Sequence, residues 1–147
     1  MRKLVSGKKS KGFTLGELLT VIALTAALFL AFTPLIRTFR HRHARVECAN
    51  NLKNIGIAMY MYANRNDGRF PPSLEVLYKE NYLSDERMMD CPGSGSTGTL
   101  EEPDYIYVAD LSLKLSENQP MLYDKDGNHP GGGAHVLMVD GEIVWKD

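Results

Sequence analysis

Residues 11–37 read KGFTLGELLTVIALTAALFLAFTPLIR, and this stretch decides how the chain is organised. The apolar run from Phe13 to Ile36 is 24 residues long. As a helix it would measure about 36 Å, which is enough to cross the hydrocarbon of a bilayer. One carboxylate, Glu17, lies inside this run, and a charge inside a membrane segment usually has a partner. The sequence therefore predicts a membrane helix with a partnered acid near its start.

The order of segments differs from that of a secretory signal peptide. A signal peptide has 7–15 apolar residues followed by a small-residue cleavage site. Here the small residue, Gly12, precedes a longer apolar run and follows a basic leader.

This order resembles the N-terminus of type IV prepilins and type II secretion pseudopilins. Every position of the family signature is filled, at Gly12, Phe13, Thr14, Leu15 and Glu17. The resemblance implies cleavage between Gly12 and Phe13 by a membrane prepilin peptidase, and N-methylation of the new Phe13 amine. It also implies that Glu17 is an assembly contact, which pairs with the N-terminus of the next subunit in a filament. Burying two such charges is favourable only when they meet.

Charge is distributed unevenly along the chain. The first 12 residues hold five bases and no acid, whereas residues 66–147 hold 16 acids and 6 bases. A basic segment suits anionic lipid, and the acidic C-terminal part argues against nucleic-acid binding. Bases flank both ends of the apolar run, so the positive-inside rule is nearly balanced. The family resemblance implies a cytoplasmic leader and a head outside the cytoplasmic (inner) membrane.

The helix is expected to continue beyond the membrane to about residue 65. Apolar residues recur there at helical spacing, at Val46, Ala49, Leu52, Ile55, Met59 and Tyr62. The turn-forming run Asn66-Asp67-Gly68 is expected to end the helix. Pro34 removes one helix hydrogen bond and is expected to kink or loosen the helix. The predicted parts are a cleaved leader (1–12), a transmembrane helix (13–36), its amphipathic continuation (37–66) and a small globular head (67–147).

The head is predicted to be a short helix followed by a small antiparallel sheet. Ser73 is a candidate cap for a helix over Leu74–Lys79. Strands are expected in YIYVAD (105–110) and PMLYD (120–124), and a hairpin in AHVLMVDGEIVWKD (134–147) with a two-residue turn at Asp140-Gly141. The predicted fold class is α+β, a long N-terminal helix packed on a small antiparallel sheet.

The second half of the chain is also similar to a large group of bacterial prepilin-like proteins. The similarity is carried by CANNLKNIGIAMYMYANRNDGRFPPSLEVL, CPGS and NHPGGGAHVLMVDGEIVW. The chain departs from that group at His135, where a polar residue is usual, and at Glu142, where histidine is frequent. The sequence does not indicate the role of the signature that runs from His129 to Gly141.

The two cysteines, Cys48 and Cys91, permit one intrachain disulfide in an exported head. Such a bridge would stabilise the fold by about 4 kcal/mol in the chain-entropy model. The alternative is two reduced, buried thiols.

Asp124, Asp126 and Asn128 alternate as oxygen donors and form a candidate calcium site, which the C-terminal calcium loop of major pseudopilins favours. The same run is also ordinary turn chemistry. His129 and His135 are a weak zinc pattern, with six-residue spacing and no further ligand. No cofactor other than calcium is indicated.

Motifs of catalysis are missing from the sequence: no Gly-x-Ser-x-Gly, phosphate loop or His-Glu-x-x-His occurs. Cys91 and His129 could form a hydrolytic pair, but this interpretation needs Cys91 as a free thiol, whereas the disulfide would use it. The sequence therefore favours a non-enzymatic protein.

The favoured interpretation is a pseudopilin of a type II secretion-like apparatus. Its expected partners are copies of itself, other pseudopilins, the prepilin peptidase, the inner-membrane platform of the secretion machinery and the lipid bilayer. The alternatives are a type IV pilin for adhesion or motility, and a membrane-tethered binding module that never polymerises.

Overall fold

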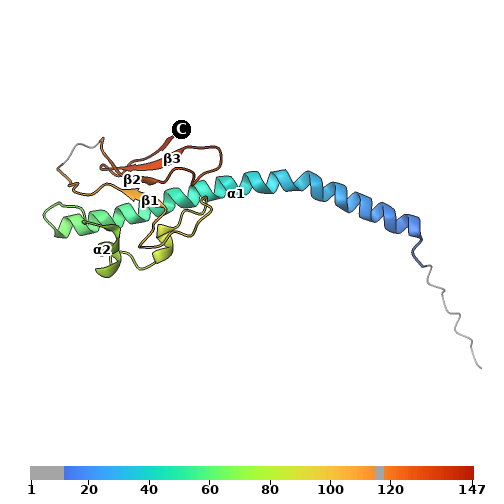
Figure 1. The fold of residues 1–147 in the computed structure, drawn as a ribbon, viewed down its shortest axis with the longest axis horizontal. Coiled ribbons are helices and arrows are strands. Elements are labelled where there is room, and N and C mark those ends of the chain that lie inside the picture. The colour runs from blue at the N-terminus through green and yellow to red at the C-terminus, as the bar shows by residue number, and fades with distance from the viewer. Residues whose placement is uncertain (1–11, 115–117) are drawn as a thin grey trace, which may run out of the picture. The chain divides into compact units, whose positions relative to one another are not determined.

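The computed structural model describes residues 12–114 and 118–147. Residues 1–11 of the predicted leader lie outside this described part. The chain divides into two units, Met1–Thr38 and Phe39–Asp147. The predicted α+β fold class is confirmed: a long N-terminal helix precedes a four-stranded antiparallel sheet (Figure 1).

Helix α1 (Leu15–Arg65) is 51 residues long and continues through Pro34. Pro34 lacks the N–H that would normally reach the Leu30 carbonyl. The Thr33 hydroxyl donates to that carbonyl instead, at 3.0 Å. The expected loosening is thus compensated locally, because a neighbouring side chain satisfies the acceptor that proline leaves free.

Helix α1 ends where the sequence predicts. The Gly68 amide donates back to the Ala63 carbonyl at 2.9 Å, and Asp67 adopts a left-handed conformation at φ 54°. This is the Schellman arrangement, which satisfies a carbonyl that the helix end would leave unpaired.

The buried stripe of α1 differs at its start from the predicted one. Leu52, Ile55 and Met59 are fully buried, as expected. Val46, however, is 61% exposed, and Cys48 takes the buried position instead. The prediction at Val46 was wrong because residues 48, 52, 55 and 59 keep the spacing of one helix face, whereas residue 46 lies off that face.

Two short helical segments follow α1. Helix α2 (Leu74–Lys79) has the predicted bounds and buries Leu74 and Leu77. Ser73 occupies the N-cap position, but its side chain makes no capping hydrogen bond, so that prediction was wrong in detail. The 3₁₀ helix η1 (Glu86–Met89) is capped by Asp85, whose carboxylate accepts a hydrogen bond from the Arg87 amide.

The sheet is an antiparallel meander in the order β1-β2-β3-β4. Its strands are β1 (Tyr105–Tyr107), β2 (Pro120–Asp124), β3 (Ala134–Met138) and β4 (Ile143–Lys146). Strand β1 is shorter than the predicted 105–110. In the β2–β3 register, Leu122 pairs with Leu137 and Tyr123 with Val136, which brings Asp124 opposite His135.

The β3–β4 hairpin forms at the predicted place, with a different turn. The Gly141 amide donates to the Met138 carbonyl and the Met138 amide to the Glu142 carbonyl. The turn thus runs through Val139, Asp140 and Gly141. Gly141 has φ 90°, and Asp140 is not in a left-handed conformation, which excludes the two-residue type I′ turn that requires two positive φ angles.

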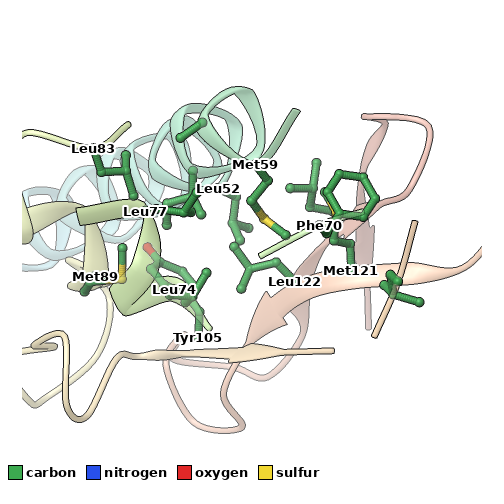
Figure 2. Packing of buried hydrophobic residues seen from close by; sticks show 14 of the residues in the cluster. Leu52, Met59, Phe70, Leu74, Leu77, Leu83, Met89, Tyr105, Met121 and Leu122 are labelled. Atoms are coloured by element: carbon green, nitrogen blue, oxygen red, sulfur yellow. The ribbon is translucent and has the colours of Figure 1, made fainter. Parts of the chain in front are cut away.

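The core of the second unit lies between the C-terminal half of α1, α2 and the sheet. Figure 2 shows Leu52 and Met59 of α1 close to Met121 and Leu122 of β2, with Leu77 and Tyr105 beside them. All of these side chains are at most 2% exposed. Burial of this apolar surface is the main force that holds the helix continuation against the sheet.

Candidate functional sites

The first candidate site is the segment around Gly12 and Phe13, where the family resemblance places cleavage. Phe13 is 80% exposed, and no atom lies within 4 Å of the position that a Cβ on Gly12 would occupy. Both residues precede α1. The segment therefore lies outside the helix and is open in the described part of the chain, which suits a protease substrate.

Thr14 and Glu17 form a capping box at the start of α1. The Thr14 amide and hydroxyl donate to Glu17 Oε2 at 2.8 and 2.9 Å. In return, the Glu17 amide donates to the Thr14 hydroxyl at 3.3 Å. The Ser/Thr-x-x-Glu pattern was visible in the sequence as Thr14-Leu15-Gly16-Glu17, and it marks a helix start. This second role of Glu17 was not predicted.

The surface of α1 that follows is apolar and open. Helix α1 is long and apolar enough to cross a membrane, and its most apolar stretch is not buried by other described residues. Side chains such as Leu24, Phe29 and Leu30 are 66–74% exposed. An apolar surface of this size suits contact with lipid or with other apolar helices.

The second candidate site is a buried polar cluster in the second unit. Cys48, Asp124, His129 and His135 are all buried, and one potential ligand atom of each lies within 4.8 Å of the others. Cys48 comes from the buried face of α1, Asp124 ends β2, His129 lies in the β2–β3 loop and His135 belongs to β3. The sheet register and the packing of α1 on the sheet bring them together.

The Asp124 carboxylate is the centre of this cluster. Its Oδ2 lies 2.9 Å from His129 Nε2 and 3.1 Å from His135 Nδ1, and it accepts the His135 amide at 2.8 Å. Its Oδ1 accepts the Cys48 thiol at 3.0 Å. Burial acts to raise the pKa of Asp124, but the hydrogen bonds from His135 and Cys48 outweigh it and hold that pKa below its usual range.

Cys91 adjoins the cluster. Its Sγ lies 3.7 Å from His129 Nε2, and a hydrogen bond with the Cys48 thiol lowers the pKa of Cys91. The same hydrogen bond, together with burial, raises the pKa of Cys48. Burial also lowers the pKa of His129, which keeps its ring neutral at neutral pH. The cluster thus combines a carboxylate, two imidazoles and two thiols, of which Cys91 has a lowered pKa.

Trp145 of β4 covers the histidines. Its ring packs edge-on against His135 at 4.7 Å and against His129 at 5.3 Å, measured between centroids. The Arg45 guanidinium lies 4.2 Å from the Trp145 ring centroid. Gly133, at φ 84°, makes room for this ring, because a Cβ there would overlap the indole. The cluster is consequently closed off from solvent on this side.

The structure distributes the predicted metal and disulfide residues differently. Of the calcium candidates, Asp124 faces the histidines, Asp126 is exposed, and Asn128 is buried and donates to the Asp104 carbonyl at 2.7 Å. Calcium binding stays a prediction. Cys48 and Cys91 are both free, buried thiols, and their oxidation also stays a prediction. Cys91 and His129, the candidate hydrolytic pair, lie close together, but both side chains are at most 3% exposed.

An apolar N-terminal helix followed by a small antiparallel sheet defines a pilin-like architecture. No family model, curated protein or solved structure matches this chain. The specific role of the protein therefore has to be argued from its own residues.

Proposed function

We propose that this protein is a pseudopilin, a structural subunit of a type II secretion-like pseudopilus. In this account prepilin peptidase removes the leader after Gly12, the new Phe13 amine is N-methylated, and the chain polymerises through its N-terminal helix. The leader faces the cytoplasm and the acidic head lies outside the inner membrane. The partners are copies of the chain, other pseudopilins and the inner-membrane platform.

The single observation that carries the proposal is the open apolar surface of α1 directly behind the Gly12-Phe13 segment. Before assembly, a bilayer covers this surface. In a filament, the same surfaces of neighbouring subunits cover each other, so one sequence serves both states. The head supports a structural role, since its close Cys–His pair is buried away from substrates. The small head favours a pseudopilus over an adhesive pilus.

Processing tests this proposal directly. We expect co-expression with an active prepilin peptidase to shorten the chain by 12 residues, or about 1.3 kDa at the mean residue mass given by 16.4 kDa over 147 residues. N-terminal sequencing should read Phe-Thr-Leu-Gly-Glu. Gly12→Leu should block cleavage, because a residue without a Cβ lets the backbone approach a protease closely.

Gly16→Leu is the matched control. Gly16 lies four residues further on, and no atom lies within 4 Å of its Cβ position either. This variant should be cleaved normally. A full-length wild-type chain in the presence of active peptidase would exclude the pseudopilin proposal.

A further inference from the structure

The cluster of Cys48, Asp124, His129 and His135 has a chemistry that the filament role does not use. It combines sulfur, nitrogen and oxygen donors from segments far apart in the sequence. All four residues are at most 8% exposed. Polar side chains normally stay in water, because burying them is costly unless they are paired. Four such side chains gathered in the interior therefore need an explanation.

The spacing of the donor atoms fits a tetrahedral metal ion. Zinc binds sulfur at about 2.3 Å and nitrogen or oxygen at about 2.0–2.2 Å, so its ligands lie roughly 3.3–3.8 Å apart. In the cluster, Asp124 Oδ2 lies 2.9 and 3.1 Å from the two imidazole nitrogens, and all four donors lie within 4.8 Å of one another. Shifts of several tenths of an ångström would convert the hydrogen-bonded cluster into a coordination shell.

The kind of donors selects the kind of metal. Calcium and magnesium take oxygen ligands, whereas thiolate and imidazole together favour zinc among the abundant divalent ions. Burial of all four donors leaves no open coordination position for a substrate. A closed site of this kind stabilises a fold and does not catalyse a reaction.

The charge and hydrogen bonding of the cluster agree with a cation. The buried Asp124 carboxylate, with the Cys48 thiol 3.0 Å from its Oδ1, supplies the acidic donor that a cation needs in the core. His129 Nε2 is turned to Asp124, so the ring presents one nitrogen to the cluster.

We propose that Cys48, Asp124, His129 and His135 bind one zinc ion, which fastens α1 to the sheet. Cys48 contributes a thiolate, Asp124 a carboxylate oxygen, and the histidines contribute Nε2 of His129 and Nδ1 of His135. Binding releases the Cys48 proton to solvent. The site joins the helix to β2, the β2–β3 loop and β3, and it does not depend on filament assembly.

The zinc site excludes a Cys48–Cys91 disulfide in the same molecule, since the metal requires Cys48 as a thiolate. Oxidation and metal binding are thus two alternative fates of one thiol. Counting free thiols in protein taken from its native compartment distinguishes them.

The test uses the full chain purified in detergent under non-reducing conditions. We expect about one zinc ion per chain by elemental analysis, a Tm that falls on chelation and recovers with added Zn²⁺, and two free thiols. Co²⁺ in place of Zn²⁺ should produce the visible absorption and thiolate charge-transfer bands of a tetrahedral cysteine-bound site. It should also quench Trp145, the only tryptophan, which packs on both histidines.

Substitutions at the ligands identify the site. Cys48→Ser and His129→Ala should each weaken Zn²⁺ binding by at least about tenfold, since even outer-shell partners contribute that much. His43→Ala is the matched control, because this histidine is 73% exposed at its side chain and lies on the same helix. The His43→Ala variant should bind zinc with the same affinity as the wild type.

Three results would overturn the proposal. One is a wild-type chain that neither holds nor takes up Zn²⁺ and whose Tm is insensitive to chelator. Another is a Co²⁺ complex without thiolate charge-transfer bands, a result that needs no variant to fold. The third is a Cys48–Cys91 disulfide in the isolated protein.

Discussion

Thr14 and Glu17 hydrogen-bond each other at the first turn of α1, with the Glu17 carboxylate accepting from both the amide and the hydroxyl of Thr14. The carboxylate that the family resemblance assigns to assembly therefore also starts the helix. These two roles are separable, because a glutamine can complete a capping box but carries no charge.

Removing the Thr14 hydroxyl tests the capping role. We expect Thr14→Val to fray the first turn and to cost about 0.5–2 kcal/mol of local helix stability. The amide of Glu17, which donates to that hydroxyl, should exchange its hydrogen faster in detergent-solubilised protein. Thr20→Val is the control, since the Thr20 hydroxyl donates to the Glu17 carbonyl and caps nothing. Equal exchange at Glu17 in both variants would argue against the capping box.

The glycines of the β2–β3 loop give a second matched comparison. Gly132 and Gly133 both have φ 84°, so alanine is strained at either position by about 1–2 kcal/mol. Only at Gly133 would the new Cβ meet the Trp145 ring. Gly133→Ala should therefore lower the free energy of unfolding by about 1–3 kcal/mol more than Gly132→Ala does. Thermal unfolding followed by Trp145 fluorescence measures the difference, and equal losses would show that the indole does not require this glycine.

The two free thiols at the polar cluster make a redox prediction. After zinc is removed, a mild oxidant should link Cys48 to Cys91, because both are free, buried thiols and the hydrogen bonding of Cys91 lowers its pKa. With zinc bound, the same oxidant should act much more slowly. Peptide mapping without reduction reports the link. Equal rates with and without zinc would show that the metal does not hold Cys48.

The fold was largely predictable because its signals are local. The apolar run, the Asn66-Asp67-Gly68 stop and the strand runs each determine structure within a few residues. The errors concern which helix face is buried and which turn type a hairpin adopts. Val46 has the right residue type for the core but lies off the buried face of α1. In the β3–β4 turn, Gly141 has a positive φ and Asp140 does not, which gives a three-residue turn in place of the predicted two-residue turn.

The polar cluster could not be assembled from the sequence. Cys48 and Asp124 are 76 positions apart, and their contact requires α1 to pack on the finished sheet. One link was within reach: pairing the predicted strands in register places Asp124 opposite His135. From the sequence, Asp124 was a candidate calcium ligand and Cys48 a candidate disulfide partner of Cys91, because neither interpretation used the packing of α1 on the sheet.

The most direct test of the central claim is the filament yield of Glu17→Gln in cells that also produce active prepilin peptidase. This variant keeps a side chain able to complete the capping box with Thr14, and Gly12 is untouched, so it should insert and be cleaved normally. It lacks the charge that we propose pairs with the Phe13 ammonium of a neighbouring subunit, and a lone buried ammonium would cost several kcal/mol. Electron microscopy and blotting of sheared fractions should show filaments of the wild type and none of Glu17→Gln alone. Equal yields from both chains would contradict assembly through Glu17, and a cleaved wild type that never forms filaments would contradict the pseudopilin account itself.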